Sequence, residues 1–195
     1  MTIHDTRRLG GSPSSRRLRR AAGALCAAVA LTSAAGVAQA SEPGIPTDIQ
    51  VQDGHKMYLE AHATGVQIYT CVAAGDGYAW GPATPRAELY ADNGKLIGSH
   101  YGGPTWEAKD GSKVVAKREA GVTVDPTAIP WLRLAATSVT AGPDGDRFAG
   151  TKYIQRVATT GGLAPAASDC TAATAGTKQE IGYTADYRFW KAVDA

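Results

Sequence analysis

His100 begins the segment of the chain in which side chains capable of chemistry lie closest together. A Gly-Gly-Pro sequence follows at 102–104, and then come Trp106 and Glu107. A histidine near a carboxylate can act as a general base or bind a metal, and loops at strand ends are common binding sites. The same histidine could instead pack on Trp106 or bond to the backbone of a turn. We therefore take His100, Trp106 and Glu107 as candidate ligand-binding residues.

A second histidine, His62, suggests a metal site assembled from distant parts of the chain. Glu60 and His62 are two residues apart, so they share one face of an expected strand. With His100 they would offer two imidazoles and a carboxylate, a ligand set that zinc and copper accept. The sequence contains no His-x-His or His-Glu-x-x-His spacing. No cofactor is therefore predicted from a motif, and copper or zinc at His62, His100 and Glu60 stands as an alternative.

Arg156 is the fourth candidate ligand-binding residue. Gln155 and Arg156 are neighbours in an expected strand over 152–158, so they point to opposite faces and one of them faces the interior. If Arg156 is inside, its buried charge requires a partner, for which Glu107 or Asp186 would be suitable. Such a pair could also serve the architecture alone.

The chain has no motif that identifies an enzyme class. A Gly-x-Ser-x-Gly elbow, a dinucleotide-binding Gly-x-Gly-x-x-Gly and a phosphate loop are all absent from the sequence. Carboxylates for a glycosidase are present, but no spacing marks two of them as a pair. Four tryptophans and eight tyrosines could stack on a sugar or another amphipathic ligand, or could fill the core.

Alternating apolar and polar residues predict strands as the elements that position these side chains. The alternation is clearest over 66–72, 87–91 and 181–189, and no long stretch after residue 40 has the period of an amphipathic helix. About eight to ten short strands in one domain are typical of an all-β fold. We therefore predict a single-domain antiparallel β-sandwich or β-barrel.

Turn-forming residues predict where these strands are connected. Asp-Asn-Gly at 92–94 and Asp-Gly-Ser at 110–112 are expected to form hairpin turns. Segments 75–85 and 161–177 are rich in glycine, alanine, proline and small polar residues, so both are expected to be loops.

Residues 1–40 have the composition of a cleaved secretory signal. A basic cluster at 16–20 precedes an apolar run at 21–37, and Ala-Gln-Ala at 38–40 places small residues where signal peptidase requires them. The apolar run is alanine-rich and shorter than the roughly 20 strongly apolar residues of a stable span, so we expect no membrane span after cleavage. The sequence predicts a secreted protein of a bacterial periplasm or the cell exterior, with one domain over 41–195.

Removal of the signal changes the charge and the cysteine content. The whole chain has a formal net charge of +2, but residues 1–40 hold several arginines and only one acid. The remaining domain is acidic, which argues against a nucleic-acid partner. Cys71 and Cys170 are the cysteines left, and in an oxidising compartment they are expected to form a disulfide. A redox-active or copper-ligating thiol pair is the alternative, although no Cys-x-x-Cys spacing supports it.

Several segments of the domain resemble the secreted family known as domain of unknown function 3455. The matching residues are those at 65–71, 98–107, 110–112, 129–132, 153–157 and 183–187, together with Gly161, Gly162, Pro165 and Cys170. A departure occurs at Tyr101 and Gly102, where the family often has Phe-Ala. The resemblance implies a secreted, mostly β domain and supports the pairing of Cys71 with Cys170. It implies no activity.

Two functions of different class fit these observations. The first is a non-enzymatic module that binds a small molecule or an envelope component near His100, Trp106 and Glu107. The alternative is a small extracytoplasmic enzyme, with or without a metal, that uses His100 and Glu107. No catalytic constellation is recognisable, so the binding module is preferred and the question of enzymatic activity is left open.

Overall fold

Nine β-strands and three single-turn 3₁₀ helices make up residues 44–193, the part of the chain that the computed structural model describes. The strands are β1 (His55–Ala74), β2 (Gly77–Trp80), β3 (Thr84–Tyr90), β4 (Leu96–Tyr101), β5 (Thr105–Ala108), β6 (Lys113–Val122), β7 (Trp131–Thr140), β8 (Tyr153–Gly161) and β9 (Lys178–Ala192). The helical turns are η1 (Thr47–Ile49), η2 (Ala167–Asp169) and η3 (Ala172–Thr174). The secretory signal predicted for 1–40 lies outside the described residues. Within 44–193, no helix has the length and apolarity needed to cross a membrane.

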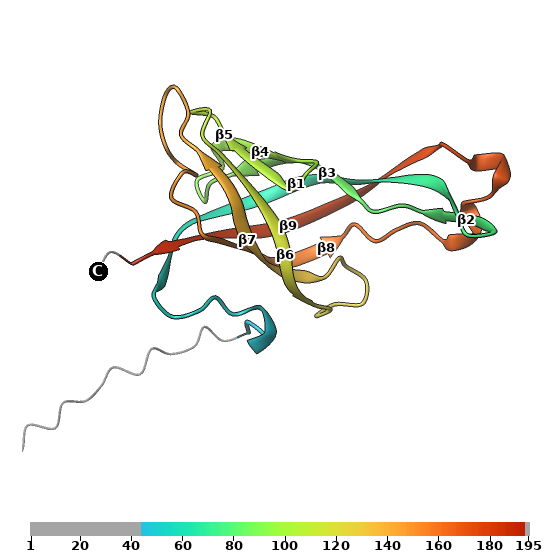
Figure 1. Ribbon diagram of the computed structural model, residues 1–195, viewed down its shortest axis with the longest axis horizontal. Coiled ribbons are helices and arrows are strands. Elements are labelled where there is room, and N and C mark those ends of the chain that lie inside the picture. Colours follow the sequence, from blue (N-terminus) through green and yellow to red (C-terminus); the bar gives the residue numbers. More distant parts are fainter. Residues whose placement is uncertain (1–43, 194–195) are drawn as a thin grey trace, which may run out of the picture. The chain divides into compact units, whose positions relative to one another are not determined.

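The strands form an antiparallel sheet that closes on itself (Figure 1). Its order is β2-β1-β3-β4-β5-β6-β7-β8-β9, and β1 also pairs with β9 along most of its length. Since β2 pairs only with the end of β1, the described ring has eight strands, β1 and β3 to β9. The predicted all-β antiparallel fold is confirmed, and it takes the form of a barrel. With 20 and 15 residues, β1 and β9 are longer than the short strands that were expected.

The connections agree with the sequence in most places. Residues 92–94 join β3 to β4 and residues 110–112 join β5 to β6, so both predicted hairpins are confirmed. The loop expected at 75–85 is wrong in part, because Gly77–Trp80 forms β2 against the end of β1. Residues 162–177 lie between β8 and β9 and contain the turns η2 and η3.

Alternation along the strands places the apolar core inside the barrel. In β9, the predicted inward face is confirmed by the burial of Tyr183, Ala185, Tyr187 and Phe189. Phe148, between β7 and β8, is fully buried and stacks on Phe189 with ring centroids 4.5 Å apart. Full burial of a phenyl side chain stabilises a fold by about 1.5–3 kcal/mol. The segment around Phe148 therefore closes one end of the barrel with apolar contacts.

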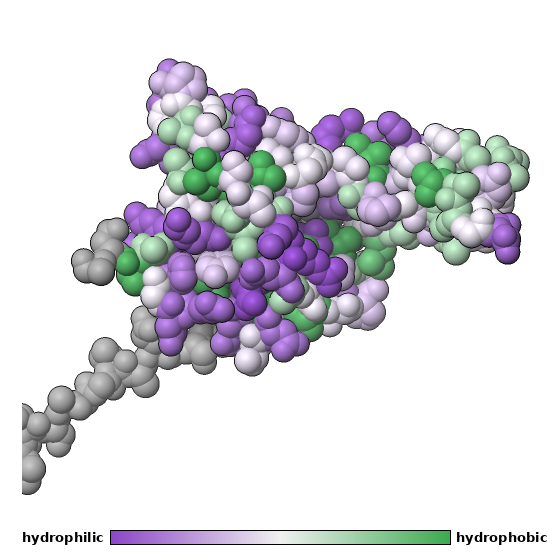
Figure 2. Space-filling model, viewed as in Figure 1, coloured by the Kyte–Doolittle hydropathy of each residue, from purple (hydrophilic) through white to green (hydrophobic). Residues whose placement is uncertain are grey.

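At the other end of the barrel, β1, β2 and β9 continue as an extension that we call the arm, residues 70–83 and 163–180 (Figure 1). Its surface is largely white and pale green in Figure 2, in contrast to the purple over much of the barrel. Val72, Tyr78 and Leu163 are exposed on it. On the face shown in Figure 2, the surface of the arm is thus less hydrophilic than that of the barrel.

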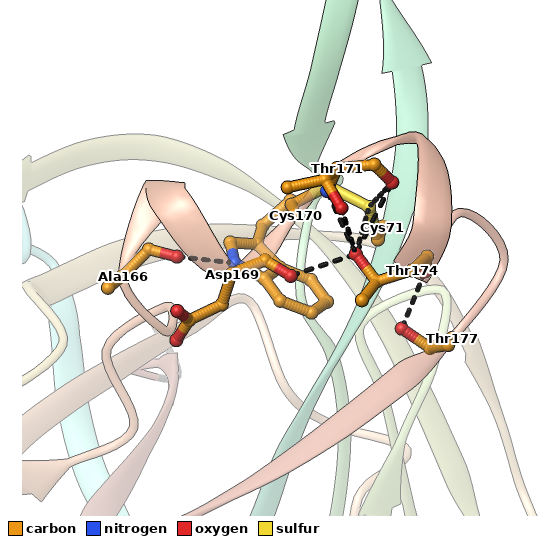
Figure 3. The surroundings of a disulfide bond; sticks show 8 residues. Cys71, Ala166, Asp169, Cys170, Thr171, Thr174 and Thr177 are labelled. Atoms are coloured by element: carbon orange, nitrogen blue, oxygen red, sulfur yellow. Dashed lines mark hydrogen bonds between the residues drawn. A yellow bond between two sulfur atoms is a disulfide. The ribbon is translucent and has the colours of Figure 1, made fainter.

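A disulfide between Cys71 and Cys170 cross-links β1 to the segment between β8 and β9 within the arm (Figure 3). The predicted pairing is confirmed. Around it, the Cys71 N–H donates to the Thr177 carbonyl at 3.0 Å, and the Gly176 N–H donates to the Cys71 carbonyl at 2.9 Å. The Trp80 indole N–H donates to the carbonyl of Ala166 at 3.1 Å. These bonds attach the segment that contains η2 and η3 to the end of β1 and to β2.

Gly65 of β1 marks a place where the strands leave no room for a side chain. A Cβ there would lie 2.2 Å from the Arg86 carbonyl oxygen and 2.5 Å from the Ala87 Cα. Both are backbone atoms of β3, so they cannot rotate away. We expect Gly65→Ala to lower the free energy of unfolding, measured in urea, by about 1–3 kcal/mol, the usual cost of overpacking.

Gly182 of β9 provides the matched control for this substitution. It lies opposite Val66 in the ladder, and no atom lies within 4 Å of the place its Cβ would take. Gly182→Ala should therefore change stability by no more than about 0.5 kcal/mol. Equal losses in both variants would contradict the steric explanation.

Candidate functional site

The end of the barrel nearest the arm is lined by polar side chains, which we call the polar interior. Alternation along five strands directs these side chains inward: Gln67, His100, Trp106, Arg156, Tyr183 and Tyr187. The register brings them together, since Arg156 is opposite Tyr187 and His100 is opposite Trp106. Three of the four ligand-binding candidates from the sequence therefore lie in one place.

His100 is almost fully buried in the polar interior, with 3% of its surface exposed. Its ring stacks on Trp106 at a centroid distance of 4.2 Å and meets the edge of Tyr187 at 5.0 Å. Its Nδ1 lies 2.9 Å from the Thr105 carbonyl, which can only accept, so Nδ1 carries the proton. Burial lowers the pKa of His100 to about 3; the hydrogen bond to Thr105 opposes this shift only in part, and the charge of Arg156 adds a smaller lowering. His100 is thus a neutral side chain at any physiological pH.

Glu107 does not join this group. It follows Trp106 in β5, so it points out of the barrel. There it accepts a hydrogen bond from the Tyr101 hydroxyl at 2.5 Å and pairs with Lys113 at 3.2 Å. Both contacts hold the pKa of Glu107 below its ordinary value. His100 and Glu107 lie on opposite faces of the sheet and do not form the acid–base pair that the sequence suggested.

Arg156 puts a positive charge in the polar interior. Its Nε and Nη2 donate to the Pro130 carbonyl at 3.1 and 2.8 Å. Within the described part of the chain, no ion pair joins it to a carboxylate, and the two acids expected to partner it, Glu107 and Asp186, pair with other side chains. That expectation was wrong. Arg156 as a whole is partly exposed.

Two phenols lie beside this charge. The hydroxyls of Tyr183 and Tyr187 are 3.3 Å apart. Burial raises the pKa of both tyrosines, and the nearby guanidinium of Arg156 only partly opposes this shift. Both phenols are therefore neutral and keep their O–H groups as hydrogen-bond donors.

The amide nitrogen of Gln67 is a buried donor for which residues 44–193 provide no acceptor. The side chain is only 3% exposed. It packs beside Tyr183: a Cβ on Gly162 would lie 3.3 Å from Gln67 Cγ and 2.9 Å from Tyr183 Cβ. A buried donor left unsatisfied costs about 1–3 kcal/mol. Trp106 Nε1 is a second donor of this kind in the polar interior.

A second group, which we call the outer cluster, lies on the outer face of β1 and β9. It consists of Glu60, His62 and Asp186, whose potential ligand atoms all lie within 4.8 Å of one another. The ladder places His62 directly opposite Asp186, and Nδ1 of His62 is 2.6 Å from Asp186 Oδ1. Its Nε2 is 3.1 Å from Asp92 Oδ1. His100 contributes no atom to the cluster, because it faces the barrel interior.

The comparisons with known proteins agree with the resemblance found in the sequence. A family model described as "Protein of unknown function (DUF3455)" matches residues 52–191. The chain belongs to this family. No curated protein and no solved structure matches it. The match extends from the residues before β1 almost to the end of β9, so the polar interior and the outer cluster both lie within the DUF3455 domain.

The outer face of the DUF3455 domain also carries two grooves. One, of about 310 Å³, lies over β3, β4 and β5, with Glu88, Ser99 and Glu107 among its lining residues. Its two glutamates each accept a short hydrogen bond from a tyrosine hydroxyl. The other, of about 460 Å³, is lined in part by Tyr58 and Lys191. Neither groove contains a buried polar atom without a partner, in contrast to the polar interior.

Sequence reasoning missed three of the residues that matter in the DUF3455 domain. Gln67 was placed on a strand but not marked as polar and buried. Asp186 was considered as a partner for Arg156 and among the carboxylates available to a glycosidase, but not as a neighbour of His62, and Asp92 was considered only as part of a turn. The alternation in β1 shows that Gln67 shares a face with Cys71. The contacts of the two aspartates depend on pairing between strands far apart in the sequence.

Proposed function

We propose that this DUF3455 domain is a non-enzymatic module that binds a small molecule carrying an anionic group at the arm end of its barrel. The observation that carries the proposal is the Arg156 guanidinium, which lies inside the barrel end with the Pro130 carbonyl and the Tyr187 side chain as partners, and with no carboxylate among its partners in the described residues. A buried or half-buried cation without an acidic partner is costly. An anionic ligand would supply the missing negative charge.

The neighbours of Arg156 are suited to hold such a ligand. Arginine has five N–H donors, of which the Pro130 carbonyl engages Nε and Nη2. The unpartnered amide of Gln67 and the two phenols add further donors on the same side of the barrel. The stacked rings of His100 and Trp106 supply an apolar wall. Small antiparallel barrels often hold one small ligand in this way.

Three features argue for binding rather than catalysis. His100 is neutral, donates a hydrogen bond to a backbone carbonyl, and lies on the opposite face of the sheet from Glu107. No carboxylate pairs with Arg156 within the described residues, so the polar interior offers no acid–base couple. The disulfide fits the predicted export to an oxidising compartment such as a periplasm. The ligand would then be a small extracytoplasmic molecule or a part of the envelope.

The proposal is tested with three anionic probes, sodium benzoate, sodium decanoate and sodium phosphate. We expect at least one of them to raise the midpoint of thermal unfolding and to bind in calorimetry. Comparison of the two carboxylates with the phosphate shows which kind of anionic group the site binds. Arg156→Gln should weaken that binding at least tenfold, because hydrogen bonds to charged groups contribute about 1.5–3 kcal/mol. Arg86→Gln is the matched control, since Arg86 pairs with Glu180 on the outer surface.

A second variant protects the test against poor folding of Arg156→Gln. Gln67→Met keeps the shape of the side chain and removes the unpartnered amide. It should leave the ligand-free protein at least as stable as the wild type and should weaken binding of the same probe. Wild-type protein that binds none of the three anions, or an Arg156→Gln variant that binds as well as the wild type, would refute the proposal.

A further inference from the structure

We infer that the outer cluster, Glu60, His62 and Asp186, is a binding site for a divalent transition-metal ion of the zinc or copper class. The site lies on the opposite face of the sheet from the polar interior and does not depend on the proposed anion binding. One imidazole nitrogen and two carboxylates are ligands that such ions accept. A fourth position would be open to water.

The geometry is close to what a bound ion requires. Tetrahedral ligands at about 2.0–2.2 Å from zinc lie roughly 3.3–3.6 Å from one another. In the outer cluster His62 Nδ1 is 2.6 Å from Asp186 Oδ1, and one ligand atom from each of the three residues lies within 4.8 Å of the other two. Side-chain rotations that shift these atoms by about 1 Å would bring them to the separations of bound ligands. The backbone of β1 and β9 is already fixed by their shared ladder.

The groups around the cluster are those that usually support metal ligands. A metal-bound histidine commonly donates its other ring N–H to a carboxylate. If Nδ1 of His62 binds the ion, Nε2 is already 3.1 Å from Asp92 Oδ1. Glu60 is oriented in a similar way by Arg188, whose Nε donates to Oε2 at 2.5 Å. A carboxylate has two oxygens, and in the proposed site the second oxygen of Glu60 binds the ion.

The charge balance also favours a divalent cation. With a neutral imidazole, the acids Glu60, Asp92 and Asp186 bring three negative charges, and Arg188 returns one positive charge. An excess of two negative charges on a partly exposed surface matches one divalent ion. The three cluster residues are partly exposed, so an ion can enter and leave without opening the barrel.

The test is a zinc titration followed by calorimetry and native mass spectrometry, on the chain purified without a polyhistidine tag. We expect one zinc ion per chain. Asp186→Asn, which keeps the size and a hydrogen-bond acceptor, should weaken zinc binding at least tenfold. Asp92→Asn should weaken it between tenfold and a hundredfold, because loss of a group that orients a ligand commonly costs 10–100-fold.

Glu88→Gln and His55→Gln are the matched controls, a surface carboxylate and a second imidazole outside the cluster. Both should bind zinc as the wild type does. Circular dichroism and the midpoint of urea unfolding establish whether each variant is folded. If Asp186→Asn does not fold, Glu60→Gln replaces it and should weaken zinc binding in the same way. Absence of stoichiometric zinc, or equal affinity in the cluster variants and the controls, would overturn the inference and mark any binding as adventitious. The anion titrations with metal chelated test the polar interior separately.

Discussion

His100→Gln is expected to make the protein much less sensitive to mild acid. In the folded protein, burial holds the pKa of His100 at about 3, against an ordinary value of 6.5. Between pH 6.5 and pH 3, His100 is therefore protonated in the unfolded chain and neutral in the folded protein. Stability from this group is complete above pH 6.5 and is lost progressively as the pH falls toward 3. By the linkage relation the loss approaches about 5 kcal/mol below pH 3, and about 3 kcal/mol of it has already occurred at pH 4.5. Glutamine does not titrate, so the variant lacks this part of the loss.

The measurement is the free energy of unfolding in urea at several pH values between 7.5 and 4.5. Most carboxylates remain ionised over the upper part of this range, so the slope there reports mainly on histidines. Glutamine can still donate to the Thr105 carbonyl that His100 Nδ1 now faces, although it loses the stacking on Trp106. We therefore expect a lower plateau at pH 7.5 with a shallower decline.

His55→Gln is the control for the pH experiment. His55 lies at the start of β1, bonds to the Gln52 carbonyl and contacts the edge of Tyr153, outside the polar interior. This variant should keep the wild-type decline. If His100→Gln also keeps the full decline, the neutral buried histidine is not the source of acid sensitivity.

The elements that the sequence predicted well are those defined by local patterns. In β9, the side chains at 183, 185, 187 and 189 alternate with polar ones, and this is the face that the barrel buries. Asp-Asn-Gly at 92–94 and Asp-Gly-Ser at 110–112 turn the chain because their residue types suit tight turns. No information from distant residues was needed for either prediction.

Closure of the barrel was beyond the sequence because it depends on pairing between the first and last strands. Alternation shows which face of β1 or β9 is apolar, but not that these two strands lie side by side. The same is true of β2, whose Gly-rich surroundings resemble a loop. It is a strand because the end of β1 extends past the ring and offers it a partner.

In the candidate site, too, some features follow from local sequence patterns and others depend on contacts between residues far apart in the sequence. Alternation alone puts Trp106 and Glu107 on opposite faces, so the grouping of both residues with His100 in one site could have been rejected from the sequence. The approach of Asp186 to His62 could not, because 124 positions separate them and only the register of β1 with β9 joins them. The unpartnered amide of Gln67 depends on every neighbour in the barrel end, and no local pattern reports it.

Removal of the disulfide is expected to have the second large effect. Cys71 and Cys170 are 99 positions apart, and a cross-link that closes a loop of about 100 residues stabilises a fold by roughly 4–5 kcal/mol in the chain-entropy model. We expect the Cys71→Ala/Cys170→Ala double variant to lose about 3–5 kcal/mol in urea titrations. The barrel should remain folded at 25 °C, since its core contains neither cysteine.

Removal of the disulfide should destabilise the arm locally and leave the barrel protected from hydrogen exchange. The segment 163–177 is attached through a few bonds near the disulfide, including those from Cys71 N–H to Thr177 and from Trp80 to Ala166. Hydrogen exchange at the amides of Cys71 and Gly176 should accelerate in the double variant, while amides of β6 and β7 keep their protection. Wild-type protein reduced with a phosphine is the control and should behave as the double variant does.

The same variant tests how the arm supports the polar interior. Tyr69 donates its hydroxyl to the Gly162 carbonyl at 2.6 Å, and Gly162 packs against Gln67 and Tyr183. A loosened segment after Gly162 should therefore weaken anion binding at Arg156 while leaving zinc binding at the outer cluster unchanged, because that cluster sits on the part of β1 and β9 held by the barrel ladder. A loss of stability below about 1 kcal/mol would mean that the unfolded chain keeps the arm together without the bond. A loss near the expected size would make the fold dependent on an oxidising compartment, which is where the predicted signal would deliver it.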